Sequence, residues 1–195
     1  MWDQGARFGP QRRFNQYHIW KALYALSRRK LGRQRLAEIV GVGEGSVRSI
    51  ISILLQENLI SVRQNGMFIT PEGKKHLEEI SLRSVSVPNN PLIPGENNIA
   101  FLVRGKGPRV GNGLELRDIA VRHGATGVTT IIQRKGGLMV APDYNIEEEY
   151  PNVVKLIHEL FPDMKGRDAI IVSSGMSREE AEEGGFFAAL HLVNS

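Results

Sequence analysis

The first part of the chain has the spacing of apolar residues that is typical of amphipathic helices. Apolar side chains recur every three or four positions in residues 14–30, 33–40 and 44–58, so each segment is expected to bury one helical face. The short Gly41-Val42-Gly43 segment predicts a tight turn between the second and third helices. The buried face of the third helix is expected to comprise Val47, Ile50, Ile51, Leu54 and Leu55.

A β-hairpin and a fourth helix are expected next. Residues 59–63 and 67–70 read as short strands on either side of Asn65-Gly66, a strong signal for a two-residue turn. Thr70 and Pro71 have the residue types of a helix N-cap and first helical position, and this helix is expected to run to about Leu82. The order of helices, turn, strands and wing is that of a winged helix-turn-helix.

Residues 84–98 are expected to form a linker. They contain Pro88, Pro91 and Pro94, and prolines at this spacing exclude a helix and favour an extended connection. The prediction is therefore a first domain over residues 1–83 and a second domain over residues 99–195.

The second domain alternates between strand and helix patterns. The order β-α-β-β-α-β-α is expected from strands 99–104, 127–134, 138–141 and 168–174 and helices 114–123, 147–161 and 177–193. Ser177 and Glu180 form a capping box for the last helix, and Gly184-Gly185 within it is expected to permit close packing. The predicted fold class is thus α+β with two domains, a winged helix-turn-helix followed by an α/β sandwich.

Charge is divided unevenly between the two parts of the chain. The whole sequence has 25 Lys and Arg against 21 Asp and Glu, a net charge of +4. Residues 1–83 contain 14 against 7, a net charge of +7, whereas residues 84–195 contain 11 against 14, a net charge of −3. The basic excess belongs to the first domain, which favours a polyanion as its partner.

Several classes of protein are excluded by composition. The chain has no cysteine, which excludes disulfides, thiolate zinc sites and a cysteine nucleophile. No apolar stretch approaches a membrane span, and the first residues lack the apolar core of a secretory signal. We therefore expect no membrane partner and a cytoplasmic location.

The segment LAEIVGVGEGSVRSIISILLQENLISVRQNGMFITPEGKKHL, residues 36–77, resembles the winged-helix domains of prokaryotic transcription regulators. The similarity covers about residues 14–83 and implies a recognition helix in the major groove of DNA. Residues on the outward face of the third helix, around the start of the second and at the wing are the expected contacts to double-stranded DNA. They are Arg28, Arg29, Arg33, Arg35, Ser46, Arg48, Ser49, Ser52, Arg63, Gln64 and Asn65.

Arginine and serine on a recognition helix suit this chemistry. Arg48 can bind guanine through two hydrogen bonds, and serine hydroxyls can contact base edges or phosphates. Glu44 departs from the pattern because it repels phosphate, although it can also accept from a cytosine amino group or stabilise the helix N-terminus. Three alternatives stay open: the winged helix binds RNA, it contacts protein, or the arginines at 28–35 are only a solvated face. Arg7, Arg12 and Arg13 in the N-terminal arm either reach DNA or are disordered.

Two glycine-rich loops are the candidate ligand sites of the second domain. Residues 104–113 offer Lys106 and Arg109 to a small anionic effector, and a second loop offers the backbone and hydroxyls of Ser173, Ser174 and Gly175. The alternatives are a mobile loop and ordinary helix capping. Helices 114–123 and 177–193 could pack on a sheet whose loops make a small-ligand cleft, and whether the two glycine-rich loops converge stays open.

The sequence contains no strong catalytic or metal-binding signature. His123, His158 and His191 are far apart, and the acidic run at residues 147–149 is better explained by a helix N-terminus. We therefore expect no catalytic residues, no metal and no cofactor, although enzymatic activity is left open.

The layout of the whole chain, including LRDIAVRHGATGVTT and EEAEEGGFFAALHL, is similar to a group of archaeal winged-helix proteins assigned as transcription regulators. Their C-terminal domain is of unknown function. The resemblance implies a regulator of archaeal origin but supplies no effector. A homodimer is expected because paired half-sites on DNA need a twofold protein, and the second domain is expected to dimerise, to sense a ligand or to do both. The alternatives are an enzyme fused to a DNA-binding domain and a winged-helix protein-interaction module.

Overall fold

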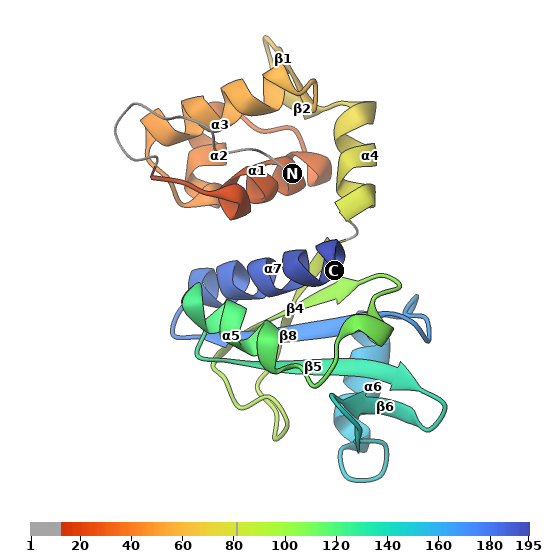
Figure 1. The fold of residues 1–195 in the computed structure, drawn as a ribbon. Helices are drawn as coiled ribbons and strands as arrows, with labels where there is room; N and C mark the ends of the chain where they lie inside the picture. The colour runs from red at the N-terminus through yellow and green to blue at the C-terminus, as the bar shows by residue number, and fades with distance from the viewer. Residues whose placement is uncertain (1–12, 81) are drawn as a thin grey trace. The chain divides into compact units, whose positions relative to one another are not determined.

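The chain folds into two compact units (Figure 1), seen here in a computed structural model that describes residues 13–80 and 82–195. The first unit comprises residues 1–79 and the second unit residues 80–195. Arg7 and Arg12 of the N-terminal arm lie outside the described residues, and Arg13 is exposed. The boundary falls before residues 84–98, so the expected linker is wrong: this segment belongs to the second unit.

The first unit has the predicted order of helices and strands. Its elements are α1 (Gln16–Arg28), α2 (Arg33–Val40), α3 (Glu44–Gln56), β1 (Ile60–Arg63), β2 (Gly66–Ile69) and α4 (Pro71–Ile80). The Asn15 side chain caps α1 by accepting from the Tyr17 amide at 3.1 Å. Gly41 ends α2 in the left-handed conformation, at φ 82°, which a residue with a Cβ rarely adopts. These signals set the helix ends locally.

The buried face of α3 is narrower than its sequence predicts. Val47, Ile50 and Leu54 are fully buried, Ile51 is half-buried, and Leu55 is 39% exposed. Leu55 follows Leu54 by about 100° around the helix, which carries it past the edge of the buried stripe. The expectation that Leu55 packs in the core is therefore wrong.

The wing is a two-stranded antiparallel hairpin, and its turn lies one residue earlier than expected. Arg63 pairs with Gly66, so the two loop residues are Gln64 and Asn65, and Gly66 begins β2 at φ 129°. Leu31 and Met67 exchange backbone hydrogen bonds of 3.3 and 2.9 Å. The segment that leads into α2 is thus attached directly to the wing.

The second unit is built on an antiparallel sheet. Residues 82–195 contain six strands in the order β3-β4-β8-β5-β6-β7, with every neighbouring pair antiparallel. Their bounds are β3 (Leu82–Val87), β4 (Asn97–Val103), β5 (Gly127–Arg134), β6 (Gly137–Val140), β7 (Tyr144–Asn145) and β8 (Ala169–Gly175). The helices are α5 (Leu114–Arg122), α6 (Pro151–Leu160) and α7 (Arg178–Asn194). The α+β class and the predicted β-α-β-β-α-β-α order are confirmed, with β3 and β7 as additional strands.

Strand β3 replaces the first part of the expected linker. It pairs along its whole length with β4, from Leu82↔Val103 to Val87↔Asn98. The prolines lie between the two strands, where Asn90 and Ile93 pair across a turn and Ile93 is 1% exposed. The prolines exclude a helix here, as expected, but Ile93 anchors their turn in the core of the second unit.

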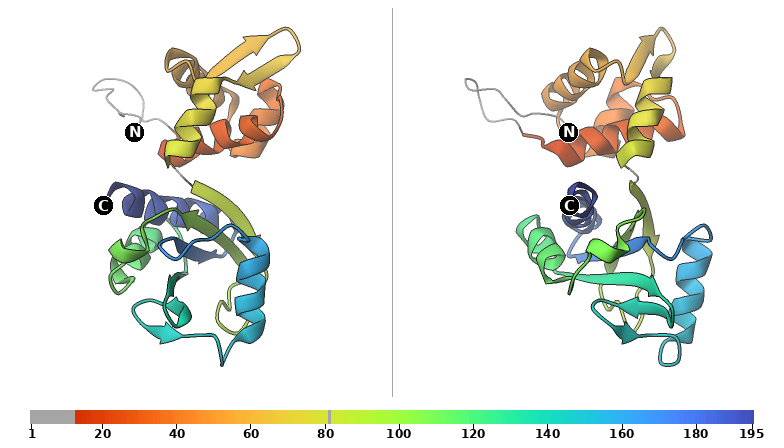
Figure 2. Two further views of the ribbon diagram at one scale, coloured as in Figure 1. Left: turned by 90° about the vertical axis from the view of Figure 1, so that its right-hand side faces the viewer. Right: turned by 45° about the vertical axis from the view of Figure 1, so that its right-hand side comes forward.

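The helices of the second unit cover both faces of the sheet (Figures 1 and 2). Helix α6 packs Val153, Val154 and Ile157 on one face in a cluster with sheet residues such as Leu102 and Val172. Helices α5 and α7 lie against each other on the opposite face. Helix α6 begins at Pro151 and not at residue 147, because proline fits the first turn of a helix but not its interior.

Helix α7 approaches the sheet closely at Gly184-Gly185, as expected. A Cβ on Gly184 would lie 2.7 Å from the Ala125 Cβ, and a Cβ on Gly185 would lie 2.7 Å from the Phe101 ring. The predicted capping box is present as well, since the Ser177 hydroxyl accepts from the Glu180 amide at 3.2 Å. Local sequence therefore sets both where α7 starts and how near it lies to β4.

Candidate functional site

The exposed face of α3 carries most of the residues predicted to contact bases. Arg48, Ser49 and Ser52 are exposed, and Ser46 is half-buried. Gly43 occupies the N-cap without a side-chain hydrogen bond, and a Cβ on Gly43 or Gly45 would meet nothing within 4 Å. The first-turn amides of α3 are thus open to an incoming anion.

Glu44 and Arg48 form an ion pair on this face. Arg48 Nη2 lies 3.3 Å from Glu44 Oε2, and the side chains are 62% and 70% exposed. The Ser49 hydroxyl donates to the Gly45 carbonyl at 3.2 Å, within its own helix. An exposed pair of this kind contributes little stability, so Arg48 can exchange Glu44 for another acceptor.

The arginines at the end of α1 and in the first turn of α2 form a second exposed group. Arg28, Arg29, Arg33 and Arg35 are all exposed, and Arg35 pairs with Glu38 at 2.6 Å. Across the described residues, the other three have no carboxylate partner, although Arg28 stacks 5.5 Å above the Tyr24 ring. Because Leu31 pairs with Met67, this group lies next to the wing.

The wing residues Arg63, Gln64 and Asn65 are all exposed. The Arg63 guanidinium lies 5.7 Å from the centre of the Phe68 ring on the opposite strand. This contact holds the side chain along the hairpin while its donors stay in solvent.

The two glycine-rich loops of the second unit do not converge. Lys106 and Arg109 follow the end of β4, at Val103, which pairs with Ala169 at the start of β8. Ser173, Ser174 and Gly175 lie at the end of β8, six residues or about 20 Å along the strand. The antiparallel pairing puts the loops at opposite ends of the sheet, so they do not form a shared cleft. Convergent polar groups, which the enzyme hypothesis requires here, are absent from these described loops.

Contacts within the fold already involve all three residues of the second loop, Ser173, Ser174 and Gly175. Ser173 is fully buried beneath Gly185, while the Ser174 hydroxyl donates to Asn98 Oδ1 at 2.6 Å. A Cβ on Gly175 would lie 2.5 Å from the Ala181 amide. This geometry fits the alternative of ordinary helix capping better than an open anion site.

An ionic network that sequence reasoning missed supports the other loop. Arg104 donates to Asp168 Oδ2 at 2.7 Å and to the Asp163 carbonyl at 2.7 Å, and it also pairs with the Asp163 carboxylate. Asp168 accepts from the Gly105 amide at 2.8 Å and from the Lys165 amide at 3.0 Å. Arg104 and Asp168 are 64 residues apart, and no local spacing signals the pair.

Asp168 is a charged anchor inside the fold. It is 3% exposed. Burial alone would raise the pKa of this carboxyl, but the hydrogen bonds from Gly105, Arg104 and Lys165 outweigh it and lower the pKa below its ordinary value. The Asp168 side chain therefore stays ionised at neutral pH and holds the loop after β4.

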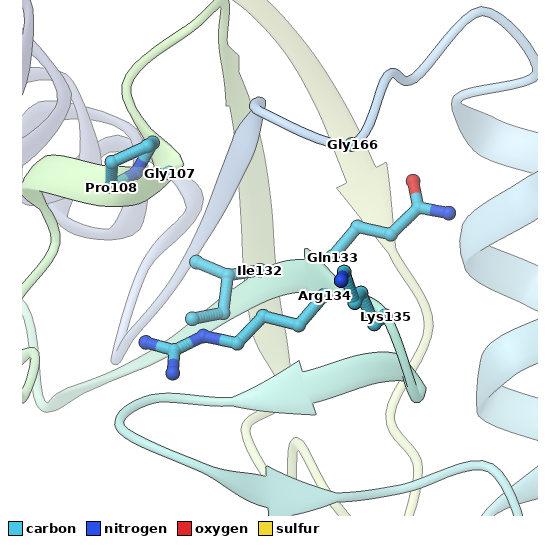
Figure 3. Close-up of a pocket in the computed structure, with 7 residues that line it drawn as sticks. All are labelled: Gly107, Pro108, Ile132, Gln133, Arg134, Lys135 and Gly166. Atoms are coloured by element: carbon cyan, nitrogen blue, oxygen red, sulfur yellow. The ribbon is translucent and has the colours of Figure 1, made fainter.

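A hollow of about 840 Å³ lies beside this loop (Figure 3). Its lining residues come from three segments that the fold brings together: Gly107, Pro108, Ile132, Gln133, Arg134, Lys135 and Gly166. Lys106 and Arg109 flank the lining glycine and proline in sequence. Lys106 Nζ donates to the Ser195 carbonyl at 2.9 Å, and Arg109 is exposed.

Neither a metal site nor a membrane-spanning helix is present in the described part of the chain. No group of three or more His, Cys, Asp or Glu side chains in residues 13–80 and 82–195 has an arrangement that could hold a metal ion. None of the helices in the same residues has both the length and the apolar character that crossing a membrane requires.

The fold defines a two-domain protein in which a unit with winged helix-turn-helix element order precedes an antiparallel α+β unit. Residues 93–192, just over half of the chain, match the family model of a domain of unknown function, DUF4443. The chain belongs to this family. Residues 12–83 match a second model, described as the CggR N-terminal DNA binding domain, so the first unit is similar to a DNA-binding domain.

One solved structure supports the architecture of the chain. The hypothetical protein PH0730 from Pyrococcus horikoshii OT3 is 24% identical, with a TM-score of 0.70 over 92% of this chain and 91% of that one. This likeness supports the fold of both units. HmgR from Pseudomonas aeruginosa matches at 14% identity over 89% of this chain and 95% of that one, with a TM-score of 0.28. A comparison with curated proteins gives no match.

Proposed function

We propose that the protein is a transcription regulator that binds double-stranded DNA through its first unit. The observation that carries the proposal is the match of residues 12–83 to a DNA-binding domain. The unit that matches is also the basic one, with a net charge of +7 over residues 1–83. Attraction to phosphates accounts for much of the affinity of such proteins.

The recognition helix in this proposal is α3. Arg48 reads a base edge after leaving Glu44, and Ser46, Ser49 and Ser52 supply further donors or acceptors. The open first turn of α3 accepts a phosphate. The arginines at positions 28, 29, 33 and 35 contact the backbone on one side, and the wing residues 63–65 enter the neighbouring minor groove.

We further propose that the protein acts as a homodimer in the cytoplasm. Paired half-sites on DNA require a twofold protein, and the second unit is the candidate for dimerisation, effector binding or both. An effector would change DNA binding only by favouring one dimer arrangement over another. The archaeal origin implied by the sequence resemblance stays a prediction.

The test is a salt titration of DNA binding with the full chain, measured by fluorescence anisotropy on random-sequence and selected duplexes. Arg29→Ala should weaken binding to all duplexes. It should also reduce the slope of the logarithm of the binding constant against the logarithm of the salt concentration by about one. Arg48→Ala should reduce the free energy of binding to the selected duplex by about 1–3 kcal/mol, and should reduce binding to random-sequence DNA by less.

The matched control is Lys75→Ala, an exposed cation on α4 of the same unit. It should change the affinity much less than either arginine variant. Unchanged affinity in both arginine variants would refute the proposed DNA-binding face.

A further inference from the structure

The hollow of the second unit arises from a mismatch between neighbouring strands. Strand β5 pairs with β8 only as far as Ile132↔Ala169. Its last two residues, Gln133 and Arg134, extend beyond β8 and pair only with β6 among the described strands. The side of β5 that β8 leaves uncovered is approached by Gly166 and by Gly107-Pro108, which complete the hollow.

The hollow combines an apolar floor with cationic walls. Ile132 is 2% exposed, and because side chains alternate along a strand, Arg134 lies on the same face. Figure 3 shows the Arg134 side chain extending beside Ile132, whereas Gln133 points away from both. Lys135 follows in the turn to β6. A ligand in this position meets a hydrocarbon surface and a guanidinium together.

The positive charge of the hollow is unneutralised. Neither Arg134 nor Lys135 has a carboxylate partner anywhere in residues 13–80 and 82–195. The flanking cations Arg109, Lys165 and Arg167 are exposed, and they too lack a partner in the same residues. Asp163 and Asp168, the carboxylates of the loop before β8, are already bound by Arg104.

The wall opposite β5 is held in place before any ligand binds. The Gly107 amide donates to the Arg167 carbonyl at 2.7 Å, and a Cβ on Gly107 would lie only 2.9 Å from the Asp168 carbonyl. The neighbouring Gly105 amide is bound by buried Asp168. Glycine is thus required at position 107, and the preformed wall lowers the entropic cost of binding.

We propose that this hollow binds a small organic anion, with Arg134 and Lys135 holding a phosphate or carboxylate group and the exposed Pro108 ring contacting its apolar part. Arginine pairs with both groups through parallel hydrogen bonds. The volume of about 840 Å³ lies in the range of small-molecule sites. The second unit has an acidic excess overall, so unpaired cations gathered at one pocket mark it as a specific site. The inference rests on the proposed effector-binding role of the second unit, not on DNA binding.

The test uses the full chain without DNA and two probes, inorganic pyrophosphate and citrate, titrated into the low-millimolar range. Binding is followed by calorimetry and by amide NMR shifts, which should change first at Gly107, Ile132 and Gly166. Arg134→Ala should weaken the bound probe about tenfold or more. Arg134→Lys should recover part of the loss, since it keeps the charge.

The matched control is Arg117→Ala, an exposed arginine on α5 outside the lining residues, which should leave the affinity within about twofold. Preference for one probe over the other distinguishes phosphate from carboxylate as the recognised group. The proposal is overturned if neither probe binds, or if Arg117→Ala weakens binding as much as Arg134→Ala.

A short duplex DNA is the last arm of the experiment. If it shifts the same three amides and displaces the probe, the hollow is a nucleic-acid contact and the effector proposal fails. Because the probe titrations contain no DNA, their failure leaves the DNA-binding proposal intact. Failure of the Arg48→Ala experiment likewise leaves this site intact.

Discussion

Glu44 and Arg48 face each other one turn apart at the start of α3, with 3.3 Å between Oε2 and Nη2. The pair places a negative charge beside the amides that an approaching phosphate would contact. In the free protein it holds Arg48 along its own helix. The proposed DNA binding by this face would therefore compete with the ion pair.

Replacing Glu44 by Gln should tighten DNA binding. The change removes the repulsion of phosphate and releases Arg48, for an expected gain of about 1 kcal/mol or roughly fivefold in affinity. The measurement is fluorescence anisotropy on the selected duplex. Glu57→Gln, at the other end of α3, is the control and should change the affinity less. Weaker binding by Glu44→Gln would instead identify Glu44 as an acceptor from a base amino group.

Replacing Asp168 by Asn should destabilise the second unit. The variant removes the charge that Arg104 binds and leaves an amide among three hydrogen-bond donors. Because the Arg104 side chain is 34% exposed, we expect the free energy of unfolding to fall by about 2–3 kcal/mol, which is less than the loss for a fully buried ion pair. Urea unfolding followed by far-UV circular dichroism measures it, with Asp143→Asn, an exposed position, as the control.

Two further readouts check this interpretation of Asp168. The second unit contains no tryptophan, and Trp20 is buried in the first unit, so the unfolding transition followed by tryptophan fluorescence should not move. The folded-state pKa of Asp168 is lowered from 3.8, so its stabilising effect is present above that pH and is lost as the pH falls through the folded-state pKa. The difference in the free energy of unfolding between the wild type and Asp168→Asn should disappear below about pH 4. A difference that does not change with pH would contradict a stabilising role for the Asp168 charge.

Replacing Gly185 by Ala should destabilise the second unit despite the higher helix propensity of alanine. The new Cβ would lie 2.7 Å from the Phe101 ring and 2.9 Å from the Ser173 Cβ. Overpacking of this kind costs about 1–3 kcal/mol, more than the gain in propensity of about 1 kcal/mol. Circular dichroism measures the unfolding.

Gly45→Ala in α3 is the matched control for Gly185→Ala. A Cβ at Gly45 would have nothing within 4 Å, so only the higher helix propensity of alanine acts. The free energy of unfolding of the first unit should therefore rise by up to about 1 kcal/mol. Tryptophan fluorescence reports that transition. Stabilisation by both variants would show that α7 can move away from the sheet without cost.

His123 should make the second unit less stable at acidic pH. Its ring stacks on Phe187 with centroids 3.7 Å apart. Burial lowers the pKa of His123 below 6.5, with Glu183 opposing and Arg122 adding to the shift. The folded state thus favours the neutral ring, and stability should fall as the pH drops through 6.5 toward the folded-state pKa.

The measurement for His123 is the free energy of unfolding from about pH 7.5 to about pH 5, that is, from about one unit above to about one and a half units below the ordinary pKa of histidine. His123→Phe keeps an aromatic ring against Phe187 and removes the proton. As the pH falls, the free energy of unfolding of the wild type should decrease relative to that of His123→Phe. Parallel pH profiles would contradict the assignment.

The sequence by itself determined the helices, most of the strands and their order, but not β3 and β7. Helical periodicity identifies α1 to α3, the Ser177 and Glu180 capping box begins α7 at the observed residue, and Gly184-Gly185 indicates close packing. These signals are local: they depend on residues within one or two turns of each other. For the same reason the helical pattern alone identifies the arginines of α2 and α3 as solvent-facing and therefore as candidate contacts.

Only the tertiary structure decided which segments meet. Strand pairing joins residues far apart in sequence, and it decided that Arg109 and Ser174 lie at opposite ends of the sheet. It also made residues 82–87 an edge strand and joined Arg104 to Asp168. The hollow beside Arg134 exists because β5 is longer than its pairing with β8. No local pattern encodes such an offset, because it is set by the register between strands.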